Sequence, residues 1–265
     1  MRVLVTGAAG AIGQVVTVGL TDRGHDVVGL DRLPPPEGST VPWHTVDSAD
    51  ADAVASVFAE ASPHAVVHLA GHPGEANLPD SLTSHVVTTA ALLDAMVEHG
   101  VRRMVYASSN HAVGHTPRTG LLTEDTRPRP DTFYGVGKVA AEALLSLYAD
   151  RRGLDTVACR IGSFLPQPET RRHLSTWLSH DDGVRMVEAA LTAPAPGYAV
   201  LYGVSANSRG WWDLEPGRRL GYQPQDDAEE FADRIVARVE DDTEAAYVGG
   251  SFVTAAYERP ALDRA

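Results

Sequence analysis

Tyr134 and Lys138, four residues apart in the segment YGVGK, are the side chains of this sequence best suited to proton transfer. In a helix, residues at this spacing lie on one face, so the phenol and the ammonium group would be neighbours. A tyrosine is a poor base because its reference pKa is about 10, but a nearby ammonium group favours the phenolate and lowers that pKa. Ser109, in the upstream segment YASSN, could orient a substrate hydroxyl toward the phenolate. The three residues predict a site where a proton leaves a hydroxyl group.

A glycine-rich segment near the N-terminus, TGAAGAIG, contains Gly7, Gly10 and Gly13 between a strand-like run and a helical pattern. A turn without side chains lets a pyrophosphate approach the helix N-terminus, where free N–H groups and the helix dipole favour negative charge. Asp31, eighteen residues after Gly13, supplies the acidic residue that this fingerprint requires. The pattern predicts a dinucleotide cofactor.

Asp31 also indicates which dinucleotide binds. Its carboxylate should accept hydrogen bonds from the adenosine ribose hydroxyls and repel a 2′-phosphate, so the sequence favours NAD over NADP. The neighbouring Arg32 leaves some use of NADP open. Asp47, after the expected third strand, could reach the adenine or cap the helix in SADADAVASVF, and the two interpretations are compatible.

The elements that must hold these residues alternate along the chain. Short β-branched runs are separated by segments of helical length, and these runs are RVLVT, HDVVGLD, HAVVHLA, RMVYASS and TVACRIG. Such alternation predicts crossover connections and a parallel sheet with helices on both faces. We therefore expect an α/β fold, a doubly wound Rossmann sheet with about six strands by residue 161.

The pattern loosens after residue 161. We expect a Pro-containing loop over 164–172, a helix over 179–193 capped by Asp181, a strand over 198–205 and a helix over 226–240. The acidic run 226–242 is most simply a solvated helix face. Without a repeat or a long linker, the chain is expected to form one domain, residues 1–265, in which residues 162–265 supply a small cover over the substrate.

Composition argues against several classes of partner. A formal net charge of −13 disfavours a basic face for nucleic acid or anionic lipid, and no stretch is apolar enough to span a bilayer. The single cysteine, Cys159, excludes an intramolecular disulfide and is expected to be a buried strand residue. The N-terminus does not resemble a signal peptide, so we expect a cytoplasmic protein. No metal site is expected, because the histidines include no helical i,i+4 pair.

The glycine turn, Asp31, the serine closing the fifth strand and the Tyr/Lys pair together resemble the extended short-chain dehydrogenase/reductase superfamily. Within it, longer segments are similar to the uronate dehydrogenases, namely ASSNHAVG, RPDTFYGVGK, RIGSFLPQP, RRHLSTWLSHDD and SANSRGWWD. That family oxidises galacturonate and glucuronate with NAD at the anomeric carbon, giving the 1,5-lactone. The resemblance runs from residue 1 to about residue 256.

The resemblance also implies roles for individual residues. Tyr134 would accept the proton with Lys138 as its partner, and Arg172 would hold the C6 carboxylate with its planar fork of donors. The implied substrate site consists of Ser109, Asn110, His111, Tyr134, Ser163 and Arg172. The implied cofactor contacts are Gly7, Gly10, Ala11, Ile12, Gly13, Asp31, Asp47, Ser48, Leu69, Ala70, Gly71, Tyr134, Lys138 and Phe164. Of the neighbouring arginines, Arg160 is expected to form a structural ion pair and Arg171 to be solvated.

Three positions depart from the family pattern. His85 stands where an asparagine is common, Gly137 replaces the serine of YGVSK, and His72 lies in a stretch where relatives have a substrate-contacting serine. Trp211 and Trp212 could wall the sugar site or be buried against the sheet.

Several functional alternatives remain open. The chain could be a sugar-nucleotide epimerase or dehydratase, a neutral-sugar dehydrogenase, or a regulator that only senses NAD. A homo-oligomer is expected by analogy. The choice between galacturonate and glucuronate depends on one hydroxyl and stays open.

Overall fold

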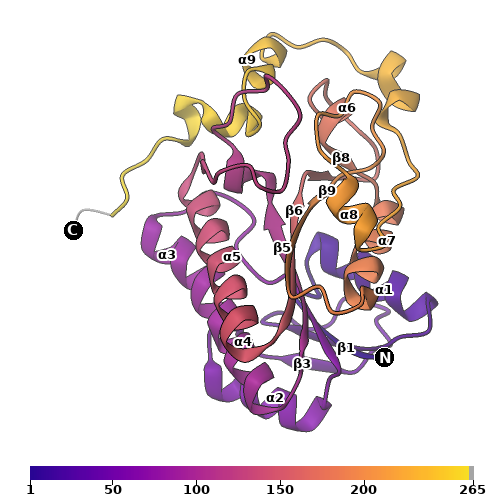
Figure 1. Cartoon of the computed structure of the whole chain (residues 1–265), viewed down its shortest axis with the longest axis vertical. Coiled ribbons are helices and arrows are strands. Elements are labelled where there is room, and N and C mark those ends of the chain that lie inside the picture. Colours follow the sequence, from indigo (N-terminus) through magenta and orange to yellow (C-terminus); the bar gives the residue numbers. More distant parts are fainter. Residues whose placement is uncertain (263–265) are drawn as a thin grey trace.

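Seven parallel strands form the central sheet of the computed structural model, which describes residues 1–262 (Figure 1). Their order across the sheet is β3-β2-β1-β4-β5-β6-β9. The strands are β1 (Arg2–Thr6), β2 (Asp26–Asp31), β3 (Trp43–Thr45), β4 (Ala65–His68), β5 (Arg103–Ser109), β6 (Asp155–Ile161) and β9 (Tyr198–Gly203). The predicted doubly wound parallel sheet is confirmed, and Cys159 lies buried in β6 as expected.

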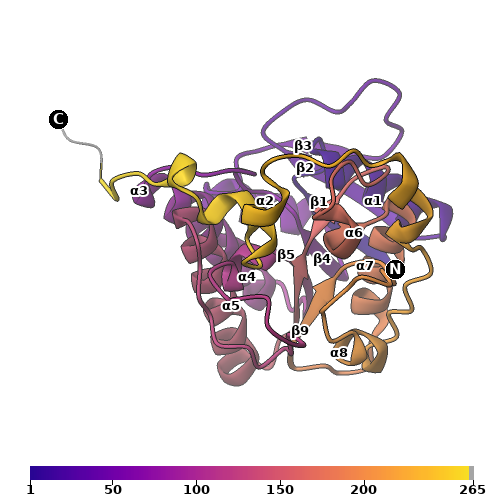
Figure 2. The same cartoon turned by 90° about the horizontal axis from the view of Figure 1, so that it is seen from above.

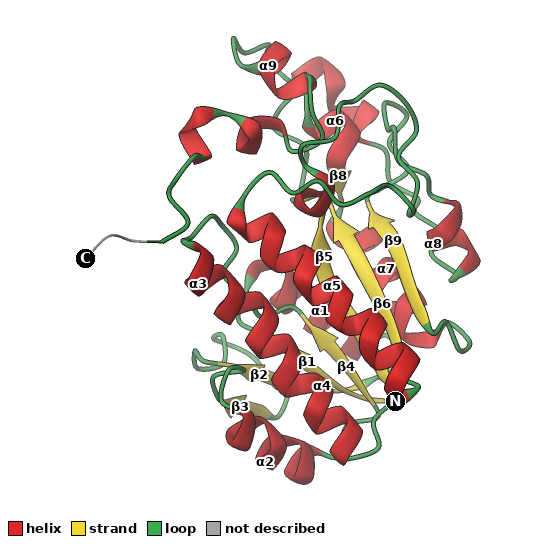
Figure 3. Ribbon diagram, turned by 60° about the vertical axis from the view of Figure 1, so that its left-hand side comes forward, coloured by secondary structure: helices red, strands yellow, loops and turns green. Residues whose placement is uncertain are grey.

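Helices cover both faces of this sheet (Figure 3). One face carries α1 (Ala11–Asp22) and α7 (His180–Thr192), and the other carries α2 (Ala51–Ala61), α4 (Thr88–Glu98) and α5 (Phe133–Arg152). Successive residues of a strand serve opposite faces: Val3 and Val5 join the core beneath α1 and α7, whereas Leu4 joins the other core. Burial on both faces makes the strands continuous apolar runs, which is why the sequence pattern identified them.

The strand order reverses between β1 and β4, which are neighbours in the sheet. From β1 the chain proceeds to β2 and β3 on one side, and from β4 to β5, β6 and β9 on the other. In such sheets ligands bind in the crevice outside the carboxyl ends of the strands at this reversal. The crevice therefore lies beside the glycine-rich turn that follows β1.

Short elements cover the carboxyl ends of β5 and β6. They are the two-stranded sheet of β7 (Ser163–Phe164) and β8 (Trp177–Leu178), with α6 (His173–Thr176) and α9 (Asp241–Ala245). Seen from above, the C-terminal segment runs across this end of the molecule toward α3 (Leu78–Leu82) (Figure 2). α8 (Glu215–Arg219) packs beside β9. Within residues 1–262, none of the helices has the length and apolar character that a membrane crossing requires.

The predicted helix over 226–240 is wrong. Only Ala228–Arg234 is helical, as a 3₁₀ turn, and the backbone is extended at Ile235. Phe231 and Ile235 already pack against Trp177, whereas Val236 and Val239 are 81% and 94% exposed. With no apolar surface for those two valines to cover, nothing stabilises further helical turns. The interpretation of the run 226–242 as one solvated helix face fails for the same reason.

Two capping predictions also need correction. Ser179, not Asp181, caps α7, and its hydroxyl accepts from the backbone N–H of Asp182. Asp50, not Asp47, caps α2, because its carboxylate reaches the N–H of Ala53. Both cases follow from the same geometry, in which the cap must immediately precede the first helical turn.

Candidate active site

The glycine-rich turn leaves room for a pyrophosphate at the start of α1. Gly7 has a φ of +68°, and a Cβ on Gly13 would lie 2.1 Å from the carbonyl oxygen of Gly7, so only glycine fits either position. Gly10 caps α1 without a side chain, which leaves the first N–H groups of the helix available. These features fit the diphosphate of a dinucleotide.

Asp31 ends β2 beside this turn. Its two carboxylate oxygens accept from the backbone N–H groups of Ala9 and Leu33, each at 3.0 Å. The carboxylate is thereby held at the end of the strand, where the fold brings adenosine ribose hydroxyls. The backbone, rather than a side chain, sets its orientation.

The other predicted cofactor residues follow neighbouring strands. Asp47 and Ser48 come after β3, and the Asp47 carboxylate accepts from the N–H of Ala49. Leu69, Ala70 and Gly71 come directly after β4, and a Cβ on Gly7 would lie 2.6 Å from the nitrogen of Ala70. Phe164, in β7, stacks on His180 with ring centroids 4.6 Å apart. The segments after β1, β3, β4 and β6 thus approach one crevice.

The helix α5 presents the Tyr/Lys pair. Thr132 caps α5, and both carboxylate oxygens of Glu75 accept backbone N–H groups, of Phe133 at 3.1 Å and of Tyr134 at 3.0 Å. Acidic groups at a helix N-terminus are stabilised by the free N–H groups and the dipole. Glu75, which the sequence pattern did not single out, thereby fixes the turn that carries Tyr134.

Tyr134 differs from the prediction in its electrostatics. Burial raises the pKa of its phenol, while a hydrogen bond with Ser109 lowers it and the charge of Asp131 raises it. Lys138 lies with its Nζ 5.4 Å from the Tyr134 ring and donates to the carbonyl oxygen of Ala107 at 2.6 Å. The predicted lowering of the Tyr134 pKa by this ammonium group is therefore wrong for the protein alone, because burial dominates. Burial also lowers the pKa of Lys138 to about 7.

A cavity of about 380 Å³ lies on the far side of His111, whose ring meets the Tyr134 ring edge-on at 5.8 Å. Ser109, Tyr134 and Lys138 do not belong to the wall of this cavity. Asn110, His111, Ser163, Phe164 and Arg172 all contribute to its wall. The structure thus brings together predicted residues from the 3₁₀ turn Asn110–Val113 after β5, from β7 and from the segment before α6, although up to 62 positions separate them. The side chain of Trp212 is instead buried with Tyr202 and Leu122, away from this wall.

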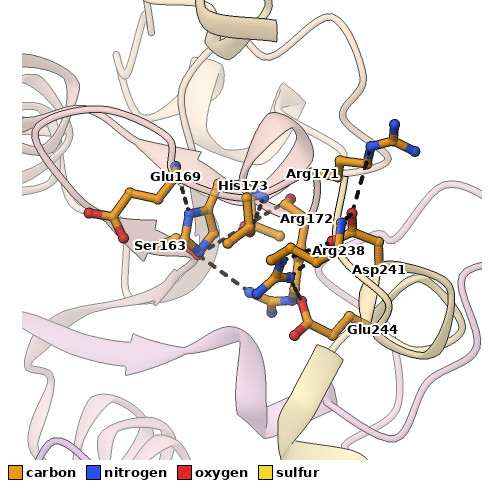
Figure 4. Close-up of polar contacts among 10 residues, drawn as sticks. Ser163, Glu169, Arg171, Arg172, His173, Arg238, Asp241 and Glu244 are labelled. Carbon is orange, nitrogen blue, oxygen red and sulfur yellow. Dashed lines mark hydrogen bonds and ion pairs between the residues drawn. The ribbon is translucent and has the colours of Figure 1, made fainter. Parts of the chain in front are cut away.

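Arg172 is a partly buried cation in the wall of this cavity. One terminal nitrogen donates to the carbonyl oxygen of Val248 at 2.8 Å. The other donates to the hydroxyl of Ser163 at 3.4 Å (Figure 4). Its Nε has no hydrogen-bond partner among the described residues. Burial lowers the pKa of Arg172 to about 10, and the charges of Glu244 and Asp131 oppose this effect. A partly buried guanidinium whose Nε is buried without a partner among the described residues favours an anionic ligand.

The neighbouring arginines do not line the cavity, and Arg160 has the structural ion pair that was predicted for it. Arg160 forms a buried ion pair with Glu142 at 2.8 Å, and Arg171 is largely exposed and faces Asp241 at 3.6 Å (Figure 4). The arginine that the sequence reasoning missed is Arg238. It lines the cavity and binds Glu244 at 2.7 Å, so the C-terminal segment adds a salt-bridged pair to the wall.

His85 and Gly137, two of the three positions that depart from the family pattern, lie next to each other in the structure. His85 is buried in a π-helical turn, Thr83–Val87, and its ring meets the Tyr134 ring edge-on at 5.1 Å. A Cβ on Gly71 would lie 2.7 Å from the imidazole, and one on Gly137 would lie 3.0 Å from it, so the two glycines make room for this histidine.

His72, the third position that departs from the family pattern, is exposed, and its backbone N–H donates to the hydroxyl of Ser84.

Comparison with known proteins agrees with this geometry. Residues 3–197 match the NAD dependent epimerase/dehydratase family. The uronate dehydrogenase of Agrobacterium fabrum is 39% identical over 258 residues, which cover 95% of this chain and 96% of that protein. The uronate dehydrogenase of Pseudomonas syringae pv. tomato is 36% identical over 257 residues, with 95% and 93% covered.

A solved structure extends the similarity to three dimensions. The crystal structure of uronate dehydrogenase from Agrobacterium tumefaciens superposes with a TM-score of 0.90 at 38% identity, covering 99% of this chain and 98% of that one. Similarity over the whole length includes the segments that form the cavity as well as the cofactor motifs. The chain therefore belongs to the NAD dependent epimerase/dehydratase family and, within it, to the uronate dehydrogenases.

Proposed function

We propose that this protein oxidises the anomeric C1 hydroxyl of D-galacturonate or D-glucuronate, in the cyclic pyranose form, to the aldaro-1,5-lactone with NAD. The observation that carries the proposal is the partly buried Arg172 guanidinium in the wall of a cavity that His111 also lines, with the His111 ring 5.8 Å from the Tyr134 ring. A uronate differs from a hexose by the C6 carboxylate, and a guanidinium binds a carboxylate with matched geometry.

NAD fits the crevice between β1 and β4. The turn of Gly7, Gly10 and Gly13 would hold the diphosphate, Asp31 the adenosine ribose and Lys138 the nicotinamide ribose. The remaining contacts would come from Ala11, Ile12, Asp47, Ser48, Leu69, Ala70, Gly71 and Phe164. Bound there, NAD would supply the acceptor for the hydride that leaves C1.

The residues of the chain supply positioning and proton transfer. Arg172 and Ser163 would fix the carboxylate end of the sugar, while Ser109 orients O1 toward the phenol oxygen of Tyr134. Tyr134 would then take the O1 proton as the carbonyl forms at C1. Its raised pKa in the protein alone means that the phenolate has to be stabilised in the complex, and a bound oxidised nicotinamide ring carries a positive charge that would do so.

The decisive experiment measures NADH formation with galacturonate, glucuronate, matched neutral hexoses and nucleotide sugars. We expect net NADH with the uronates alone. An epimerase would turn over a nucleotide sugar without net NADH, and a neutral-sugar dehydrogenase would prefer the hexose. A regulator that only binds NAD would turn over nothing.

Replacement of Arg172 tests how the substrate is recognised. Arg172→Ala should lower kcat/KM for the uronate by about 100-fold, since hydrogen bonds to charged groups contribute about 1.5–3 kcal/mol. The loss for the corresponding neutral hexose should be much smaller. Arg171→Ala, one residue away and solvent-exposed, is the matched control. An equal loss of kcat/KM on both sugars would show that Arg172 does not bind the C6 carboxylate.

We further propose a single domain in which residues 162–265 contribute the substrate cover, although residues 263–265 lie outside the described part. Exposed apolar side chains on adjacent helices, Val97 in α4 and Leu147 in α5, support association into a homo-oligomer. A cytoplasmic location is supported by the single buried thiol, which needs no oxidising compartment.

A further inference from the structure

Asp131 carries a fully buried carboxylate that the chemistry above does not use. It lies immediately before Thr132, the cap of the helix that carries Tyr134. Its Oδ2 is 2.7 Å from Nδ1 of His111, and its Oδ1 accepts the hydroxyl hydrogen of Thr132 at 3.0 Å. A buried charge persists only where its hydrogen-bonding capacity is met, so these contacts explain how the carboxylate is tolerated.

Two glycines from distant segments enclose this carboxylate. A Cβ on Gly114 or on Gly249 would lie 1.9 Å from Oδ2 of Asp131. The N–H of Gly249 also donates to the carbonyl oxygen of Gly114 at 2.9 Å, which ties the two segments together. The backbone thus forms a compartment of the size of this carboxylate, and it holds the group against His111.

The contact with Asp131 dictates the tautomer of His111. A carboxylate only accepts hydrogen bonds, so Nδ1 of His111 must carry the hydrogen and, in the neutral ring, Nε2 is an acceptor. The imidazole is further fixed by Phe252, whose ring centroid is 4.0 Å away. His111 lines the substrate cavity, whereas Asp131 lies behind it.

The residue next to His111 supplies the complementary donor. Asn110 also lines the cavity, and its buried Nδ2 has no hydrogen-bond partner among residues 1–262. A buried donor without a partner is costly unless a ligand satisfies it. An acceptor on His111 beside a donor on Asn110 matches one sugar hydroxyl, which donates through its hydrogen and accepts at its oxygen.

We propose that Asp131 is a positioning residue, which locks His111 in the Nδ1–H tautomer so that Nε2 accepts a hydrogen bond from a hydroxyl of the pyranose ring. The identity of the ligand rests on the proposed function, but the tautomer does not. Asp131 acts on the ring hydroxyl through His111, and its charge also acts on Arg172 and Tyr134, so the His111→Ala background separates the two effects.

The first test is ¹⁵N NMR of the histidine side chains in the full-length protein, with His111→Gln used to assign the His111 signals. We expect the Nδ1–H tautomer at neutral pH. An Nε2–H tautomer in the unmodified protein would overturn the proposal, whatever the substrate proves to be. In Asp131→Asn, whose amide can donate to Nδ1, we expect the opposite tautomer.

The second test is a double-mutant cycle with the uronate. Asp131→Asn and Asp131→Ala should each raise KM by about 10-fold, the effect of one hydrogen bond, with kcat changed by less than about 3-fold. In a His111→Ala background the same substitutions should add no further rise in KM. The neutral hexose should lose as much as the uronate, since both carry the ring hydroxyls.

The results of these two tests separate the role of Asp131 from the proposed function. Unchanged KM in both Asp131 variants, or losses that persist fully without His111, would show that Asp131 does not act through the imidazole. If the uronates prove not to be substrates while the Nδ1–H tautomer is found, the proposed function fails and the tautomer assignment stands.

Discussion

Tyr134 and Glu75 illustrate how single residues divide the work of this site. Tyr134 is partly buried, and desolvation raises the pKa of its phenol, so the residue ionises readily only with help from a bound partner. Glu75 holds the backbone of Tyr134 in place with a carboxylate that accepts two N–H groups at once. The sequence pointed to Tyr134 as the proton acceptor that we propose, because its chemistry is visible in its type, but it did not point to Glu75.

The proton acceptor can be tested by removing one oxygen atom. Tyr134→Phe should lower kcat for the uronate by at least about 100-fold, because general acid–base catalysis contributes about 10²–10⁴-fold. Binding of NAD, measured by calorimetry, should be little changed. Near-native turnover of this variant would exclude Tyr134 as the proton acceptor. Tyr148→Phe, at the exposed hydroxyl on the same helix, is the control.

The C-terminal segment shows what whole elements contribute. Its 3₁₀ turn, Gly250–Val253, brings Phe252 onto His111 and packs Gly250 against the guanidinium of Arg172. The segment thus contacts two cavity residues, His111 and Arg172, which lie at least 78 positions earlier in the chain. The paired glycines of GGSF were the signal in the sequence that could have pointed to this approach.

A methyl group on Gly250, where it packs against Arg172, should disturb the substrate site. Gly250 has a φ of +62°, and a Cβ there would lie 2.3 Å from Nε of Arg172. We expect Gly250→Ala to raise KM for the uronate by about 10-fold or more by displacing the guanidinium. Gly38→Ala is matched for backbone strain, with φ +81° and no atom within 4 Å of the added Cβ. Steady-state kinetics would contradict this prediction if both variants behaved alike.

Considered as a whole, the molecule keeps several ionisable groups neutral in its interior. Burial lowers the pKa of His68 to about 3 and that of His85 to about 2, with the charge of Lys138 adding to both shifts. Both values lie below the unfolded reference of about 6.5. The unfolded chain therefore binds these protons first, so this stability is complete above about pH 6.5 and is lost progressively as the pH falls toward about 3.

The consequence is an acid sensitivity that one substitution should reduce. Each histidine contributes a slope of about 1.4 kcal/mol per pH unit to the free energy of unfolding between roughly pH 6 and pH 4. His85→Asn should remove one such contribution, and urea denaturation across this range measures it. The same substitution at the exposed His64 is the control. An unchanged slope in His85→Asn would mean that His85 is protonated in the folded state.

The sequence by itself determined the parallel sheet, the glycine turn with Asp31, and the residue types to which we assign proton transfer and the binding of an acid. These follow from local patterns, because a doubly buried strand must be apolar and a turn against a diphosphate must lack side chains. Only the tertiary structure decided which distant groups meet. Asp131 touches Gly114 and Gly249, and Arg172 donates to Val248, 76 positions away. Such contacts depend on the path of the backbone through space, and the predicted helix over 226–240 failed because no surface was there to stabilise it.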